Sequence, residues 1–282
     1  LNMFFILVCL TCVYPFLIIV GTSFNTEQAI ALYGYSVIPK EPTMLAYRFL
    51  FENSAIILRA YAVTIFVTLV GTALTVVVCG LYGYAISRRE FKLKKFFTFY
   101  IFFTMLFSGG TVPWYLICTR VLHINNTIWA LILPMVCGAW NIIILKTFFQ
   151  TSVPDAIIEA ARIDGASEVR TFFKIVCPIA LPGLATIALF AMLGYWNDYY
   201  NAMMLTTEIE LQNLQLYLYN ILKSASILQG KGTQISEAAQ GQLPQESARM
   251  AICIFSVAPI LFAYPFFQRY FIQGLTVGSV KG

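Results

Sequence analysis

Charged residues are scarce in this chain of 282 residues: only 11% are Asp, Glu, Lys or Arg, whereas 59% are hydrophobic. The mean hydropathy is +0.77. This composition excludes an ordinary soluble domain, in which about 25% of residues are charged. The chain is therefore expected to be an integral membrane protein.

Signatures of catalysis and of nucleotide binding are also missing. The sequence contains neither a glycine-rich phosphate loop ending in Gly-Lys-Ser/Thr nor a serine elbow, and His123 is its only histidine. Cys9 and Cys12 have the spacing of a redox motif, but inside an apolar run we interpret them as packing residues. We expect no catalytic residue, no metal and no cofactor bound by this chain.

Six apolar runs are long enough to cross about 30 Å of hydrocarbon. No basic leader precedes the first run and no clear cleavage site follows it, so we interpret it as a retained helix and not as a signal peptide. The sequence predicts an all-α membrane protein, a single domain over residues 1–282. Segments 22–60 and 206–247, outside the membrane, look irregular. The six runs lie at about 3–20, 61–86, 96–118, 126–148, 180–204 and 249–268.

A charged loop at residues 150–178 separates the fourth and fifth runs and has the pattern of a helix, a tight turn and a second helix. Ser152 with Asp155 resembles a capping box, and Pro154 is tolerated in a first turn. Gly165 stands where a helix would end in a left-handed conformation. Such a loop outside the lipid is expected to bind another protein.

The loop also contains the spacing Glu159-Ala160-Ala161, three residues, Gly165, nine residues, Ile175, two residues, Pro178. This pattern resembles the EAA loop of ATP-binding-cassette importer permeases. Residues 141–190 and the tail at 268–282 resemble the carbohydrate branch, which contains the maltose-type permeases. Cys177 departs from the family, which usually has Leu there, but Cys is also a small hydrophobe. The two alanines leave a small-residue surface against which a partner could pack.

The resemblance implies a type I importer permease with six transmembrane helices and a cytoplasmic helix-turn-helix coupling loop. It would pair with a second homologous permease and two cytoplasmic ATPases, which hold ATP and magnesium. An extracellular solute-binding protein would deliver a carbohydrate, and within the cytoplasmic tail at 269–282 the part from Gly274 could reach the ATPase dimer. The residues 107–111 resemble permeases for complex oligosaccharides. ATPase coupling would use Glu159, Ala160, Ala161, Asp164, Gly165 and Ala166.

Charge placement predicts the orientation. Segment 87–95, the coupling loop with Lys146, and the tail hold more than half of the 18 basic residues, although the other exposed segments are longer. The positive-inside rule therefore places these segments and both termini in the cytoplasm of a prokaryotic cell. The net charge of +5 reflects this bias. No basic stripe with interleaved aromatics indicates nucleic-acid binding.

Asp198 is the only acidic residue inside the six runs, and an ionisable group in a membrane is a candidate functional residue. On a continuous helix, Trp196, Tyr199 and Tyr200 would share one face. Flat rings beside amides and a carboxylate suit a sugar, but Trp and Tyr also form ordinary belts at the membrane surface. Both interpretations stay open. The candidate substrate path comprises Trp196, Asn197, Asp198, Tyr199, Asn201 and Asn141.

Helix breaks are expected at two places. Residues 107–111 lie inside an apolar run and precede Pro113, which favours a break or a close helix contact. Pro134, Gly138 and Asn141 interrupt the fourth run, where a broken helix could line a translocation path or a simple proline kink could occur.

Three other functions remain as alternatives. A self-contained secondary transporter would need ion-coupling groups, for which one Asp is thin evidence. A membrane enzyme would need a nucleophile or a metal set. Within the family, the cargo could be another small solute such as glycerol phosphate.

Overall fold

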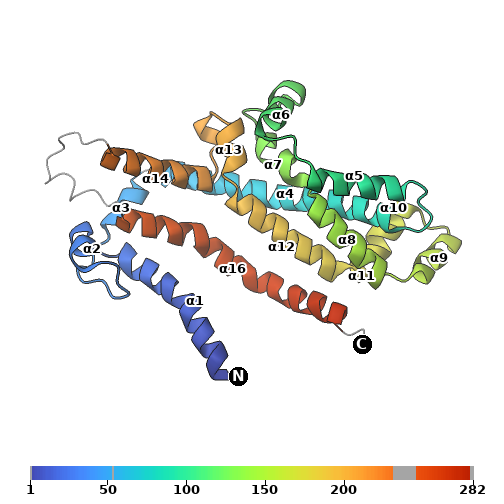
Figure 1. Ribbon diagram of the computed structural model, residues 1–282, viewed down its shortest axis with the longest axis horizontal. Helices are drawn as coiled ribbons and strands as arrows, with labels where there is room; N and C mark the ends of the chain where they lie inside the picture. The colour runs from blue at the N-terminus through green and yellow to red at the C-terminus, as the bar shows by residue number, and fades with distance from the viewer. Residues whose placement is uncertain (1, 53, 231–245, 280–282) are drawn as a thin grey trace. The chain divides into compact units, whose positions relative to one another are not determined.

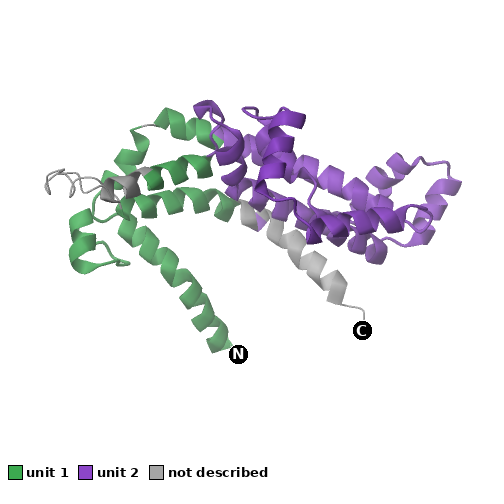
Figure 2. Ribbon diagram, turned by 45° about the horizontal axis from the view of Figure 1, so that its top comes forward, with its two compact units in different colours: residues 1–61, 214–262 green, residues 62–213, 263–282 purple. Residues whose placement is uncertain are grey.

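The computed structural model describes residues 2–52, 54–230 and 246–279. These residues are helical, apart from loops and one isolated bridge between Asn25 and Pro42 (Figure 1). The predicted all-α class is confirmed. Figure 2 shows two compact units, each built from two stretches of sequence: Leu1–Tyr61 with Leu214–Phe262, and Ala62–Asn213 with Ala263–Gly282.

Side chains cap two helices of the first unit, one of them from a distant segment of the chain. The hydroxyl of Thr26 accepts the amide of Ala29 at 3.1 Å and begins α2. The carboxylate of Glu27 accepts the amides of Glu246 and Ser247 at 3.2 and 2.8 Å, which pairs N–H groups that α16 itself leaves unsatisfied. The helices that contribute to this unit are α1 (Asn2–Ser23), α2 (Glu27–Tyr33), α3 (Leu45–Phe51), the start of α4 (Ser54–Ser87), α14 (Leu214–Gly230) and the start of α16 (Glu246–Ser279).

The prediction that segments 22–60 and 206–247 are irregular is wrong for much of their length. Helices α2, α3 and α14 lie within them, and α4 already begins at Ser54. Helices α2 and α3 have only seven residues each, so the apolar period, such as Ala46 and Leu50 one turn apart, is too short to detect in the sequence. Residues 231–245 of the second segment lie outside the described residues.

The second unit packs α4, α5, α8 and α12 around a core near the end that carries the coupling loop (Figure 1). Its most buried side chains include Cys79, Ile142, Leu145, Val176 and Ile187, all at 0% exposure. Its elements are α4 (Ser54–Ser87), α5 (Lys94–Leu106), α6 (Thr111–Leu116), η1 (Ile117–Val121), α7 (Trp129–Val136), α8 (Ala139–Ser152), α9 (Asp155–Ile163), α10 (Glu168–Thr171), η2 (Phe172–Val176), α11 (Cys177–Ile179), α12 (Leu181–Asn197), α13 (Tyr200–Leu205) and η3 (Ile209–Leu211).

Two single helices among the described residues, α1 and α4, are long and apolar enough to cross a membrane. Three further spans arise if each bent pair is counted as one: α5 with α6 and η1, bent by 117°, α7 with α8, bent by 48°, and Glu168–Ile179 with α12, bent by 87°. The sixth expected run lies in α16, which is helical as far as Ser279, so residues 269–279 are helical too. The count of six spans stays a prediction.

The breaks expected at residues 107–110 and at Gly138 are present, between α5 and α6 and between α7 and α8. A third break, at Asp198, was not expected. Run 180–204 is therefore two helices, α12 and α13, and not one. The carboxylate of Asp198 accepts the backbone amide of Asn201 at 3.2 Å, and a side chain that bonds a nearby amide competes with helix continuation.

Candidate functional site

Helix α9 begins at Asp155, after a break that follows the end of α8 at Ser152. The predicted capping box is wrong, because Ser152 belongs to α8 and the N-cap position is Pro154, with no side-chain cap. Pro154 causes the break: it lacks an amide hydrogen and disfavours a helical conformation in Val153. The φ and ψ of Pro154 are −62° and 135°.

Gly165 ends α9 in the left-handed conformation that the sequence predicts, with φ of 76°. The amide of Gly165 donates to the carbonyl of Arg162 at 3.0 Å, and the amide of Ala166 donates to the carbonyl of Ala161 at 3.0 Å. These two bonds form a Schellman motif, with Asp164 as the C-cap. Ser167 then caps α10 by accepting the amide of Arg170 at 3.4 Å. The turn is thus closed by backbone hydrogen bonds to the end of α9 and by the side-chain cap of Ser167 at the start of α10.

The two faces of α9 differ. Ile158 and Ala161 are buried against the second unit at 2% and 5% exposure, whereas Glu159 and Ala160 are exposed. The two alanines therefore do not form the one open surface expected from the sequence, because neighbouring residues of a helix point about 100° apart. The open face carries Ile163 instead, which is 87% exposed.

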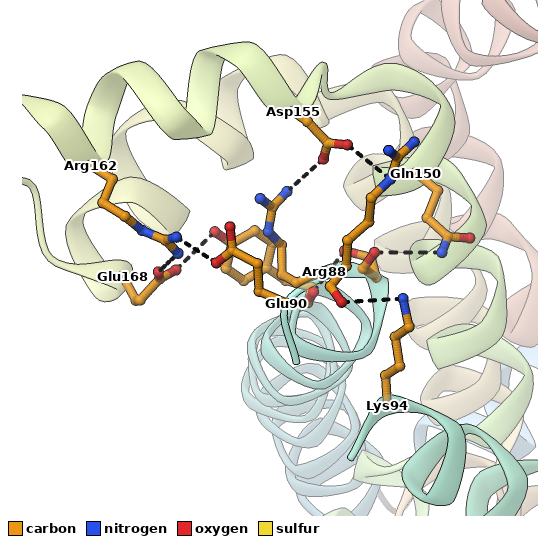
Figure 3. Close-up of polar contacts among 10 residues, drawn as sticks. Arg88, Glu90, Lys94, Gln150, Asp155, Arg162 and Glu168 are labelled. Atoms are coloured by element: carbon orange, nitrogen blue, oxygen red, sulfur yellow. Dashed lines mark hydrogen bonds and ion pairs between the residues drawn. The ribbon is translucent and has the colours of Figure 1, made fainter. Parts of the chain in front are cut away.

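Arg162 joins three segments of the second unit (Figure 3). Its Nη2 donates to Oε1 of Glu168 at 2.7 Å, and its Nη1 forms an ion pair with Glu90, in the segment between α4 and α5. The hydroxyl of Tyr84 donates to Oε2 of Glu168 at 3.2 Å. The hydrogen bond from Arg162 holds the pKa of the Glu168 carboxyl below its ordinary value. Arg162 and Glu168 therefore join α9 to α10 across the turn, and Glu90 and Tyr84 attach both to the end of α4 and the segment after it.

A second set of ion pairs holds the start of α9. Asp155 accepts from Nη1 of Arg88 at 3.3 Å and from Nε of Arg89 at 3.1 Å (Figure 3). The Arg88 side chain is only 14% exposed, whereas that of Arg89 is 86% exposed. Both ends of α9 are thus attached to the segment that follows α4, so the loop and that segment are expected to move together.

Asp198 and its neighbours are arranged differently from the predicted single face. Trp196 is buried at 7% exposure, and Tyr199 is 41% exposed. The Asp198 carboxylate accepts both the amide and, at 3.0 Å, the side-chain Nδ2 of Asn201, which is itself buried. The Asn213 side chain donates to the carbonyl of Asp198. The acid therefore shapes the junction of α12 and α13.

The exposed members of this cluster are Asn197, Tyr199 and Tyr200. The Tyr200 hydroxyl donates to Oγ1 of Thr111 at 3.2 Å, and its ring lies 5.7 Å from that of Trp114. Asn141 lies elsewhere, on the first turn of α8, where its amide occupies the space that a side chain at Gly138 would need.

Comparison with known proteins identifies the family. Residues 77–277 match the family described as binding-protein-dependent transport system inner membrane component. The chain belongs to this family. It is 38% identical over 280 residues to the polygalacturonan/rhamnogalacturonan transport system permease protein YtcP of Bacillus subtilis (strain 168), covering 99% of this chain and 96% of that protein. It is 36% identical over 270 residues to Protein LplC of the same strain, covering 96% and 90%.

A solved structure is similar throughout. The permease matches a chain from the crystal structure of a bacterial ABC transporter involved in the import of the acidic polysaccharide alginate. The TM-score is 0.80 at 28% identity, covering 96% of this chain and 94% of that one. The predicted architecture of a type I importer permease is therefore confirmed. As a member of this family, the chain is a transport component and not an enzyme.

Sequence reasoning did not predict that Arg162, Glu90 and Asp155 connect the permease's coupling loop to the end of α4. Arg162 and Glu168 flank Gly165, so opposite charges across a predicted turn could have suggested that pair. Glu90 and Arg88 are far from the loop in sequence, and only the fold brings them to it. The exposure of Ile163 was also not predicted, although an Ile between charged residues of a polar loop indicates a possible contact with a partner.

Proposed function

We propose that this permease is one of two transmembrane subunits of an ATP-driven, binding-protein-dependent importer for a carbohydrate. The observation that carries the proposal is the open face of α9 in a member of this family. That face presents Glu159, Ala160 and Ile163, which is 87% exposed. The adjacent turn is held in place by the ion pairs of Arg162. An exposed large apolar side chain on a rigid polar loop is suited to packing against a protein partner.

The partner at this face is proposed to be a cytoplasmic ATPase, two copies of which would bind ATP and magnesium. Glu159 is exposed and available to a basic residue of the ATPase. Because ion pairs attach α9 to the segment after α4, ATPase closure that moves α9 would also move α4. This link would convert hydrolysis into helix movement between inward-open and outward-open states. A second, homologous permease and an extracellular solute-binding protein complete the proposed assembly.

The orientation supports this arrangement. The segment after α4, the coupling loop with Lys146, and the tail together hold more than half of the 18 basic residues, and we propose on this basis that they lie in the cytoplasm together with both termini. We place the permease in the cytoplasmic membrane of a prokaryote.

The cargo is proposed to be an oligosaccharide. YtcP is named for the transport of polygalacturonan and rhamnogalacturonan, and the similar crystal structure is that of a transporter involved in the import of the acidic polysaccharide alginate. Oligosaccharides that contain uronic acids are therefore the first candidates, and glycerol phosphate is the alternative cargo. Sugar contacts would come from the exposed residues Asn197, Tyr199 and Tyr200, whose amide and rings suit the hydroxyl rim and C–H faces of a sugar.

Affinity purification from the native membrane tests the assembly. We expect the chain to co-purify with a second permease and two ATPase copies, and vesicles containing that complex, supplied with its solute-binding protein, to accumulate labelled oligogalacturonides only with ATP. A stable homo-oligomer that transports sugar without an ATPase would contradict the proposal. Uptake by the chain alone, driven by a proton or sodium gradient, would instead indicate a secondary transporter.

A further inference from the structure

A groove on the second unit lies between the start of α5 and the end of α8, outside the coupling loop. It has a volume of about 470 Å³. Lys94, Lys95 and Lys146 line it together with Phe99, Phe102 and Ile143. We propose that this groove binds the headgroup of an anionic phospholipid, with the lysines on the phosphate and the aromatic rings along an acyl chain.

Among the described residues, no acidic side chain neutralises the positive charge of the groove. None of the three ammonium groups forms an ion pair with a residue that the structure describes. Lys94 donates only to the carbonyl of Arg89, at 3.4 Å. The nearby carboxylates of Glu90 and Asp155 are already bound by arginines. Three cationic groups around one groove therefore have no counter-ion within the part of the chain that the structure describes.

The position of each lysine makes an external anion favourable. Lys94 and Lys95 occupy the first turn of α5, where the positive end of the helix dipole opposes a cation and an anion is stabilised. Lys146 lies within α8, about 9 Å before its end at ~1.5 Å per residue. Because the apolar run ends at about residue 148, Lys146 lies close to the membrane surface, where a polar partner is favourable.

The apolar wall indicates a lipid as the source of that anion, and not a free ion. Phe99 and Phe102 are 64% and 48% exposed, and they continue along α5 into Phe103 and Phe107, whose rings stack at 4.5 Å. A groove with cations at the membrane surface and exposed rings below them matches the layout of a phospholipid. Basic pockets between transmembrane helices commonly bind such headgroups.

The test uses the complex purified with the subunits that accompany it, in nanodiscs of phosphatidylcholine with or without phosphatidylglycerol. Native mass spectrometry would measure retained phosphatidylglycerol for the natural chain and for Lys94→Gln/Lys146→Gln. At about a fivefold loss for each lysine near a membrane surface, we expect the loss of two lysines to lower the affinity about thirtyfold. Lys94→Arg/Lys146→Arg keeps the charge and should retain the lipid.

The matched control is Lys92→Gln/Lys174→Gln, which removes two exposed lysines of the same unit that do not line the groove. It should change lipid retention by less than about threefold, because screened charges outside the groove act only through the surface potential. Equal loss in both double variants would overturn the proposal in favour of a general electrostatic effect. Displacement of the lipid by millimolar inorganic phosphate would mean a small-anion site, and cross-linking of Phe99→Cys to the second permease would mean a subunit interface; each also overturns it.

Discussion

The guanidinium of Arg162 donates to the carboxylate of Glu168 at 2.7 Å, which joins α9 to α10 across the turn at Gly165. Both side chains are about half exposed, so the pair adds little to overall stability. Its effect is geometric: together with Glu90, it fixes the direction of α9 relative to α4. The proposed transmission of movement by this loop needs this kind of rigidity more than it needs stability.

The pair should be insensitive to pH in the physiological range. Hydrogen bonding to Arg162 lowers the pKa of Glu168, so its contribution is complete above the ordinary value of 4.5 and is lost only as pH falls below it. Hydrogen exchange of residues 155–171, corrected for intrinsic rates, should be equal at pH 8 and 6 and faster below about pH 4. Arg162→Gln should remove the acceleration of hydrogen exchange at acid pH. Loss of protection already at pH 6 would contradict this assignment.

Gly165→Pro should separate hydrolysis from transport. Proline cannot adopt the φ of 76°, and it has no amide hydrogen to donate to the carbonyl of Arg162. The turn must therefore change. We expect normal membrane abundance, lost sugar uptake and weaker ATPase retention on pull-down. Gly165→Ala is the matched variant: its side chain would meet nothing within 4 Å, and only the left-handed strain of about 1–2 kcal/mol remains. It should keep most of the uptake, and normal transport by both variants would show that this loop is not the coupling element.

Ile163→Glu should release the ATPase without unfolding the permease. Ile163 is 87% exposed, so a charge there costs nothing within the chain but would be buried at the proposed interface. ATPase retention on pull-down and the thermal midpoint in detergent are the two measurements. Ile158→Glu is the contrast, because at 2% exposure it should lower abundance itself. If Ile163→Glu retains the ATPase fully, the open face of α9 does not bind it.

Asp198→Asn distinguishes a structural role from sugar contact. Asparagine keeps one oxygen that can accept the backbone amide of Asn201 but loses the second, which accepts Asn201 Nδ2, so a role at the helix junction predicts only a small loss of uptake. Asp198→Ala removes that acceptor and should cost about 0.5–2 kcal/mol at the start of α13, with lower abundance and uptake. Uptake at limiting sugar, normalised to membrane level, is the measurement. A tenfold or greater loss in Asp198→Asn at normal abundance would mean that the carboxylate itself contacts the cargo.

Gly71→Ala should destabilise the second unit. A side chain at Gly71 would lie 2.5 Å from Cζ of the buried Tyr195 ring, whose hydroxyl bonds the carbonyl of Ile132 at 2.9 Å. Overpacking of this kind costs about 1–3 kcal/mol, so the thermal midpoint and membrane level should fall. Gly80→Ala, on the same helix, would approach Phe172 only to 3.3 Å and should be tolerated better. Equal stability of both variants would show that α4 and α12 can separate at Gly71.

Local chemistry allowed several features to be predicted from the sequence. The low charge and long apolar runs determined a helical membrane protein, because lipid requires backbone groups to pair within each segment. Gly165 determined the end of α9, since few other residues adopt its φ cheaply, and Gly138 marked a real helix break. The spacing of the EAA loop identified the family, which the match over residues 77–277 confirms.

The tertiary structure decided which side of each element faces inward. It buried Ala161 and Trp196 and exposed Ile163, although helical spacing alone allowed the opposite. It brought Glu90 and Arg88 to the coupling loop and turned Asp198 toward Asn201. These outcomes depend on packing between segments distant in the chain, for which local propensity and periodicity carry no information. The sequence by itself therefore determined the long apolar helices, the turn and the family, whereas packing determined which residues are exposed to a partner.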